Sequence, residues 1–391
     1  KRATDAAKKT GAHVQMAISY ATTPYHTKEV YADLAKSYAD FGADSICIKD
    51  MSGLLKPYEA YDLVKAIKKA VDLPVEIHSH ATTGLSVATL AKAAEAGADI
   101  FTIAHDNLGK LLAGSGTIAP VTDEDLVANI EDTIDPIFQD VIYMSAAGGQ
   151  SEFYAVPIIK QALVLFYNKD YLSDSDVVSW EKILEVAESK GKLATTYIGS
   201  DGFNYSHWLL AQPESDDAIA AFKEKGTLQV YGAGLAQNCY AWGDDQVAIA
   251  KYAQRFTSTY MANKVVSDDG WEKDLGAVPS KIATVIGGAW SLARIINYLG
   301  EDGYGVTVLP TFTLTDADAY GTAKAGMVFR SGSFFDAKVM CKKKGSAFAD
   351  YLDDILLYLS SNEIQQQSYI QCANLPASKN IDLGSNELAN A

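Results

Sequence analysis

Three side chains in the first quarter of the sequence are of types that bind metal ions. His78 and His80 stand two residues apart in 75–80, an apolar run that predicts a β-strand, so both imidazoles would point to the same face of a sheet. Lys49 lies near the end of the preceding predicted strand, 45–50. An ammonium group has no lone pair, so the lysine can join a metal site only as a carbamate. The alternative is that all three are polar strand-end residues in solvent.

Strand and helix patterns alternate through the first hundred residues and would place these side chains at one edge of a sheet. Val30, Leu34 and Tyr38 are expected to share one face of the first helix. The alternation predicts parallel βαβ units, which form either half of a (β/α)8 barrel or one lobe of an open sheet. The predicted strands cover 13–20, 45–50, 75–80 and 100–103, and the predicted helices cover 28–41, 58–71 and 86–96.

Three segments of this region resemble the carboxyltransferase domain of biotin-dependent enzymes, the family of pyruvate carboxylase, the oxaloacetate decarboxylase α subunit and the transcarboxylase large catalytic subunit. They are ISYATTPYHT (18–27), GADSICIKDMSGLLKP (42–57) and EIHSHATTGL (76–85). The resemblance covers residues 1 to about 100. It implies that Lys49 is carbamylated and holds a divalent zinc, manganese or cobalt ion together with His78 and His80. The implied enzyme would act on pyruvate or oxaloacetate in the cytoplasm.

Two departures from that family count against catalysis. The family has a further metal ligand, an Asp in an Asp-x-x-x-Arg-Asp-Ala-His-Gln type motif, and nothing in this sequence supplies it. Ala81 stands where the family has Asp after the second histidine. The opening strands and the last strand of the barrel are also absent. We therefore expect no cofactor and no catalysis, and keep a metal-dependent, biotin-linked carboxyltransferase or decarboxylase as the alternative.

The sequence beyond residue 105 has longer loops and contains all five tryptophans. Its pattern predicts helices at 179–190, 216–224, 245–261 and 347–360, and strands at 283–287 and 305–309. The lysine run 342–344 is expected to be a solvated turn. Four segments, in this order, resemble the maltose/maltodextrin-binding family of extracellular solute-binding proteins that serve ABC transporters. They are DIFTIAHDNLG (99–109), YAVPIIKQALVLFYNKD (154–170), IGGAW (286–290) and YGVTVLPTF (304–312).

This second resemblance implies a sugar site between two lobes. Sugar rings stack on aromatic side chains, and their hydroxyl groups bond to carboxylates and amides. Asp106 matches a ligand-contacting Asp of the family, whereas the family often has Glu at Gln161 and Arg at Asn107, so the site is altered. Core packing of the aromatic residues and helix capping by Asp106 are the structural alternatives. The expected ligand-binding residues are Asp106, Asn107, Gln161, Tyr205, Trp208 and Trp290.

Together the two resemblances predict an α/β chain with a two-lobed, periplasmic-binding-protein-like fold. Residues 1–104 would form a half-barrel-like segment that begins the sheet of the first lobe. Residues 105–391 would form the solute-binding part, with a second lobe at about 157–297 and a return to the first lobe at about 298–391. The two parts meet within 97–103, which predicts one continuous sheet across the join.

Composition limits the partners. The 391 residues carry a formal net charge of −16, which repels nucleic acid, and no apolar run is long enough to span a membrane. We see no signal peptide, and the four cysteines form no CxxC pair. The solute-binding interpretation implies a small-molecule sugar and an ABC transporter permease as partners, and a location outside the cytoplasm.

Overall fold

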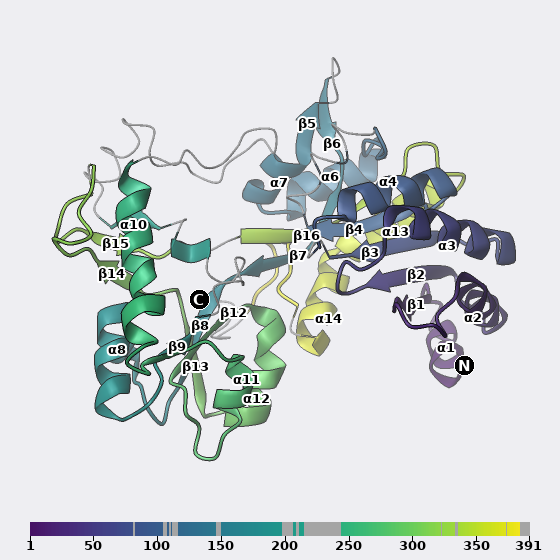
Figure 1. The fold of residues 1–391 in the computed structure, drawn as a ribbon. Coiled ribbons are helices and arrows are strands. Elements are labelled where there is room, and N and C mark those ends of the chain that lie inside the picture. Colours follow the sequence, from purple (N-terminus) through teal and green to yellow (C-terminus); the bar gives the residue numbers. More distant parts are fainter. Residues whose placement is uncertain are drawn as a thin grey trace.

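The computed structural model shows two lobes joined by strands that run between them (Figure 1). One lobe is built around a six-stranded sheet and the other around smaller sheets. Mixed α/β structure in two lobes is the architecture expected from the sequence. The described residues are 1–80, 83–104, 108, 111, 116–145, 150–197, 206–208, 211–214, 244–321, 323–332, 335–372 and 374–383.

The first sheet continues across the join between the two resemblances. Its first four strands pair in parallel, and its fifth, β16, is antiparallel to both of its neighbours. The central strand β4 pairs with β3 on one side and with β16 on the other, which confirms the predicted continuity. In spatial order the strands are β1 (Gln15–Ser19), β2 (Ser45–Asp50), β3 (Val75–Ser79), β4 (Ile100–Ala104), β16 (Phe335–Lys342) and β7 (Val156–Ala162).

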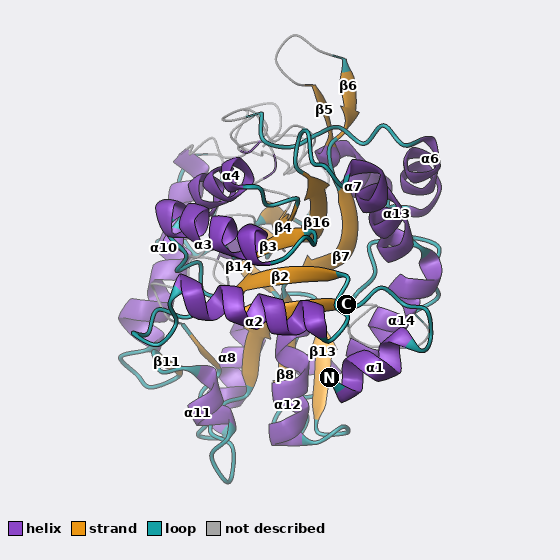
Figure 2. Cartoon of the chain, turned by 90° about the vertical axis from the view of Figure 1, so that its right-hand side faces the viewer, coloured by secondary structure: helices purple, strands orange, loops and turns teal. Residues whose placement is uncertain are grey.

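Three helices cover the apolar face of the parallel strands: α2 (Lys28–Asp40), α3 (Pro57–Ala70) and α4 (Ser86–Ala96) (Figure 2). The expected buried face of α2 is partly wrong. Val30 is 47% exposed, and Tyr31 and Ala35 are buried instead. The Tyr31 hydroxyl accepts a hydrogen bond from the backbone N–H of Ala21 at 2.8 Å, so this side of the helix faces the end of β1.

The opposite face of the same strands carries polar side chains. Register places Lys49 beside His78 and His78 beside Thr102, and the two-residue period of a strand points all three away from α2–α4. In a closed (β/α)8 barrel this face would be the packed interior. Here it is partly covered by α1 (Arg2–Lys8) and α13 (Ala349–Ser360).

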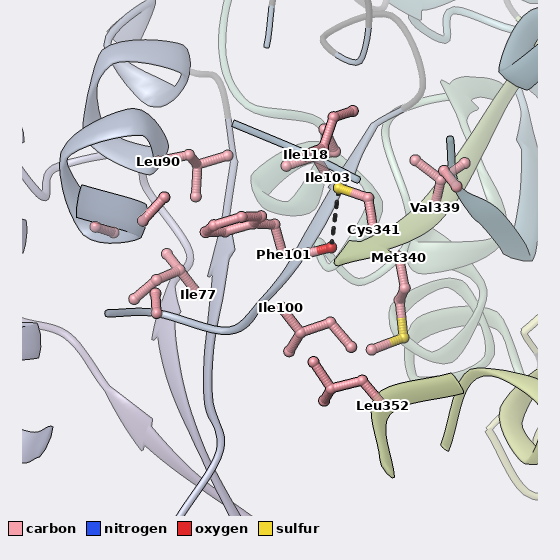
Figure 3. Packing of buried hydrophobic residues seen from close by; sticks show 14 of the residues in the cluster. Ile77, Leu90, Ile100, Phe101, Ile103, Ile118, Val339, Met340, Cys341 and Leu352 are labelled. Atoms are coloured by element: carbon pink, nitrogen blue, oxygen red, sulfur yellow. Dashed lines mark hydrogen bonds between the residues drawn. The ribbon is translucent and has the colours of Figure 1, made fainter. Parts of the chain in front are cut away.

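Helix α13 is fixed to this face by a buried ion pair. Lys342 at the end of β16 contacts Asp353 of α13 at 2.5 Å, and both side chains are nearly buried. The expectation of a solvated turn at 342–344 is therefore wrong for Lys342. Figure 3 shows the buried side chains around β4, with Met340 close to Leu352 of α13, and with the Cys341 thiol donating to the Phe101 carbonyl at 3.7 Å.

The remaining described elements of the first lobe pack around the end of the sheet that bears β16 and β7. Asn129 of α6 donates a hydrogen bond to the hydroxyl of Ser360 in α13 at 2.9 Å, which links two helices far apart in the sequence. Cys47 and Cys341 are buried free thiols. The elements are α6 (Glu124–Thr133), α7 (Pro136–Ile142), β5 (Tyr143–Ser145), β6 (Ser151–Phe153) and α14 (Asn362–Cys372).

Among its described residues, the second lobe contains three small sheets and an aromatic core. The strands are β12 (Thr284–Gly287), β8 (Val164–Asn168) and β13 (Tyr304–Thr307) in one sheet, β10 (Gln212–Pro213), β15 (Val328–Arg330) and β14 (Thr311–Thr313) in another, and β11 (Val266–Ser267) with β9 (Thr195–Thr196). The main helices are α8 (Trp180–Ser189), α10 (Asp244–Arg255), α11 (Trp271–Leu275) and α12 (Leu292–Leu299). The expected helix 216–224 lies outside the described residues.

Strand pairing places the boundaries of the second lobe at other residues than the expected range of about 157–297. The strand β7 stays in the first sheet up to Ala162 because it pairs with β16, and β8 begins the second lobe at Val164. Strands β13, β14 and β15 pack with the second lobe, so the chain rejoins the first sheet only at β16. In the described part of the chain, no helix has the length and apolar character needed to cross a lipid bilayer.

Candidate functional site

One edge of the first sheet carries four of the predicted site residues that the structure describes, Lys49, His78, His80 and Gln161. The four parallel strands end at this edge, β7 ends there at Ala162, and the chain then crosses into the second lobe at β8 (Figure 1). Ligands of open α/β sheets bind outside the carboxyl ends of the strands, where the connecting loops vary on a rigid base. The edge that faces the second lobe is therefore the candidate site.

Trp290 approaches this edge from the second lobe. It lies in a short helical turn, Ala289–Ser291, that follows β12, and its side chain is 40% exposed. Gly287, the last residue of β12, pairs with Val164, the first residue of β8 after the crossing. The register thus brings the Trp290 turn close to the point where the chain leaves the first lobe.

The absence of a side chain at Gly288 leaves room for the Trp290 indole. A Cβ atom built on Gly288 would lie 2.2 Å from Cζ3 of Trp290, much closer than any van der Waals contact allows. Close approach of a side chain to bare backbone is a use for which glycine is suited. The Gly-Gly-Ala-Trp segment therefore fixes the position of the indole through the absence of a side chain.

Gln161 lies on the first-lobe side of the same crossing. It is the penultimate residue of β7 and pairs with Asp336 of β16. Its side chain is half-buried. The two expected residues Asp106 and Asn107 follow directly after β4, whose last residue, Ala104, pairs with Lys338 of β16, but both lie outside the described residues.

Trp208 does not reach the candidate site. It is 2% exposed and packs in the aromatic core of the second lobe, with its ring centroid 4.9 Å from that of Phe256 and 5.1 Å from that of Phe312. The alternative of core packing therefore describes this side chain, and its expected use as a stacking platform is wrong. Tyr205, the other expected platform in this segment, lies outside the described residues.

Lys49, His78 and His80 lie at the carboxyl ends of β2 and β3, as the sequence indicates. Lys49 pairs with His78 across the two strands. The rings of His78 and His80 are stacked, with centroids 5.3 Å apart and planes 5° from parallel. Desolvation, and then the neighbouring ammonium groups of Lys338 and Lys49, lower the pKa of His78 to about 3, so this imidazole is neutral at physiological pH.

The arrangement of these three side chains does not fit a divalent metal. The lone pairs of an imidazole lie in the plane of its ring, so two stacked rings direct them along separate planes rather than toward one ion. Within the described residues, no three His, Cys, Asp or Glu side chains gather as a metal site. We therefore derive no catalytic step through a metal.

The polar face of the sheet holds one network that the sequence analysis missed. Glu76 is buried on β3, and its carboxylate accepts hydrogen bonds from the Thr102 hydroxyl at 2.6 Å and from the Gln15 amide at 2.6 Å. Burial raises the pKa of Glu76. The sequence feature that could have revealed this network is the two-residue period of a strand, which places Glu76 and His78 on one face of β3.

Alanine at position 288 is expected to displace the Trp290 indole, because the new methyl group would occupy the space of the ring. We expect greater acrylamide quenching of the Trp290 fluorescence, obtained by subtracting the signal of a Trp290→Phe variant. Gly270→Ala is the matched control, since its Cβ would meet only the flexible end of Glu272 at 3.6 Å. Unchanged quenching in Gly288→Ala would contradict the geometry of the turn.

Comparison with known proteins separates the two parts of the chain. A pyruvate carboxylase subunit from Methanocaldococcus jannaschii is 48% identical over 122 residues, which are 31% of this chain and 21% of that protein. The methylmalonyl-CoA carboxyltransferase 5S subunit of Propionibacterium freudenreichii subsp. shermanii is 50% identical over 97 residues, 24% of this chain and 19% of that protein. The chain thus spans about a fifth of the length of these curated relatives.

Solved structures share the fold over most of the chain. A maltodextrin binding protein from L. casei matches with a TM-score of 0.54 and 20% identity, over 89% of this chain and 84% of that one. The GacH receptor of Streptomyces glaucescens matches with a TM-score of 0.57 and 18% identity, over 88% of this chain and 84% of that one. These likenesses confirm the two-lobed binding-protein architecture.

A family model supplies the sequence-level assignment. The model described as bacterial extracellular solute-binding protein matches residues 62–391, most of the chain. The match begins before the expected join at residue 99, so it overlaps the carboxyltransferase-like segment. The chain therefore belongs to the family of bacterial extracellular solute-binding proteins, with a carboxyltransferase-like segment at the start of its first lobe.

Proposed function

We propose that this protein binds a carbohydrate of the maltooligosaccharide type between its lobes, without catalysis, and presents it to an ABC importer outside the cytoplasm. Family membership supports solute binding. The names of several structural neighbours support a sugar, since they include a maltodextrin binding protein and a cyclo/maltodextrin-binding protein complexed with maltotetraose.

The observation that carries the proposal is the exposed indole of Trp290 at the edge between the lobes. A pyranose has an apolar face that stacks on such a ring, and its hydroxyl groups need acceptors and donors at the rim. The amide of Gln161 supplies both kinds of group on the opposite side of the crossing. Asp106 and Asn107 would add a carboxylate and a second amide from the segment after β4.

Three substitutions relative to the resembled family favour an altered sugar preference. Gln161 and Asn107 remove one negative and one positive charge from the rim, and Ile103 replaces a stacking tryptophan. Ile103 is buried in the first-lobe core, so it offers no stacking surface. We therefore expect weaker binding of maltose than a site with two aromatic platforms would give.

Titration calorimetry with maltotriose and maltotetraose tests this proposal. We expect saturable binding by the parent chain and about tenfold weaker binding by Trp290→Ala, because one aromatic–sugar stack contributes on the order of 1–1.5 kcal/mol. Trp271→Ala is the control, since Trp271 lies on α11 and stacks against Arg294. Equal affinity in Trp290→Ala, or no saturable binding of any sugar in an array, would contradict the proposal.

Metal analysis tests the alternative function. A carboxyltransferase or decarboxylase that uses Lys49, His78 and His80 would retain about one zinc, manganese or cobalt ion per chain. The stacked imidazoles of His78 and His80 speak against it. Sugar binding that is indifferent to a chelator supports the transport function, and a tightly held metal together with no sugar binding favours the enzyme.

A further inference from the structure

A pocket lies on the helical side of the first sheet, between the first turns of α2 and α3, which run side by side over the strands (Figure 2). Its volume is about 490 Å³, toward the small end of the range for small-molecule sites. All of its lining residues lie between positions 20 and 63, within the carboxyltransferase-like segment. The strand that leads into it, β1, is at the opposite end of the sheet from β7, so the pocket is separate from the candidate sugar site.

This pocket is also separate from a larger cavity of about 1010 Å³, which lies over the polar face of the sheet. Lys49 and His78 line that cavity, so it continues the candidate site. Ser19 of β1 pairs with Lys49 and shares its face. Tyr20, the next residue, lies on the other face, where its ring stacks on Tyr31 of α2 with centroids 5.9 Å apart. The two hollows therefore open on opposite faces of the sheet.

Three aromatic rings contribute to the pocket. Tyr31 is buried and packs behind Tyr20, and the ring of His26 lies 5.9 Å from that of Tyr31. The hydroxyl of Tyr20 donates a hydrogen bond to Glu59 of α3 at 3.0 Å, which orients the ring. Tyr20 is half-buried and His26 is exposed, and both line the pocket. Their rings provide a surface on which a flat apolar face can stack.

The charged groups at the rim of the pocket are engaged with one another. Lys56 contacts Glu59 at 3.1 Å, and Lys28 lies 3.6 Å from Asp62. Hydrogen bonds within the first turn of α2 lower the pKa of the remaining carboxyl, Glu29. The structure describes every lining residue, and these two lysines and three carboxylates leave the rim close to neutral. The rim thus has little attraction for an ion, whereas its ammonium and carboxylate groups retain free hydrogen-bonding capacity.

We propose that this pocket binds a neutral pyranose, with its apolar face on the rings of Tyr20 and His26 and its hydroxyl groups bonded to the two ion pairs of the rim. A sugar ring is apolar on one face and carries donors and acceptors around its edge, which matches this combination. A charged ligand would compete with an existing ion pair, and a wholly apolar ligand would desolvate the rim without replacing its hydrogen bonds. The site does not depend on the proposed sugar binding between the lobes, because it uses no residue beyond Leu63.

Saturation-transfer NMR titration with methyl α-D-glucopyranoside tests the proposal on the full chain carrying Trp290→Ala, which removes the stacking surface between the lobes. We expect saturable binding at millimolar concentration. Adding Tyr20→Ala should weaken it about fivefold, because the aromatic–sugar stack is lost. Tyr25→Ala is the matched control, since Tyr25 lies in the same loop, is 85% exposed and does not line the pocket. The charged analogues methyl glucuronide and glucosamine should bind no more tightly than the neutral sugar.

Three results would overturn the proposal. They are the absence of saturable binding by the folded Trp290→Ala chain, equal affinity with and without Tyr20→Ala, and at least tenfold tighter binding of either charged analogue. Binding of the glucoside that is lost in Trp290→Ala but kept in Tyr20→Ala alone would also refute this site, while supporting the site between the lobes. Far-ultraviolet circular dichroism checks folding. If Tyr20→Ala fails to fold, His26→Ala, which removes an exposed ring of the same pocket, takes its place and should weaken binding about threefold.

Discussion

Replacement of Asp99 by alanine is expected to lower the free energy of unfolding by about 3 kcal/mol, because it leaves buried donors without an acceptor. Asp99 is buried at the join between the two parts of the chain. Its carboxylate accepts hydrogen bonds from the Lys68 ammonium at 3.1 Å, the Val75 backbone N–H at 3.0 Å and the Ser346 hydroxyl at 2.9 Å. Lys68 and Val75 belong to the carboxyltransferase-like segment, and Ser346 to the solute-binding part.

Urea denaturation at pH 7 measures this effect. Asp99→Asn keeps an acceptor but removes the charge opposite Lys68, so we expect it to cost about 1–2 kcal/mol, less than the alanine variant. Asp62→Ala is the control, because Asp62 is exposed and its ion pair with Lys28 spans 3.6 Å, an arrangement worth at most about 0.5 kcal/mol. A loss in Asp99→Ala no larger than in Asp62→Ala would show that the join does not depend on this carboxylate.

The sequence predicted the elements of the first lobe well because their signals are local. Alternating strands and helices, with Gly97 in the left-handed conformation at the end of α4, follow from patterns within thirty residues. The buried face of α2 was predicted only in part: Leu34 and Tyr38 pack against the core, but Val30 is exposed and Tyr31 is buried. Tyr31 is buried through its contact with Ala21, and helical spacing carries no information about such a contact.

The features that the sequence could not predict depend on contacts between distant segments. Lys342 is buried because α13, which begins after it, turns back over the sheet and supplies Asp353. Trp208 is buried because Phe256 and Phe312 close around it from other elements. The cavity over the polar face exists because half a barrel has been joined to an open sheet. Each strand pattern by itself is consistent with a closed barrel.

His78 is expected to make the protein sensitive to acid. The folded state lowers its pKa to about 3, mainly by desolvation and then by the charges of Lys338 and Lys49, whereas the unfolded chain has the ordinary value of 6.5. As the pH falls below 6.5, the unfolded state binds this proton first. The contribution of the neutral His78 side chain to the free energy of unfolding is complete above pH 6.5. It is lost progressively toward pH 3, at no more than about 1.4 kcal/mol per pH unit.

Unfolding free energies measured in urea between pH 7 and pH 4 test this dependence through the difference between the parent and His78→Gln. The difference is needed because the pKa of His13 is also lowered, chiefly by burial, and therefore adds to the slope in the same direction. We expect His78→Gln to lose about 1 kcal/mol per pH unit of the parent slope in this range. Parallel curves for the parent and His78→Gln would mean that this imidazole titrates alike in both states, and that the two lysines do not act on it across the sheet.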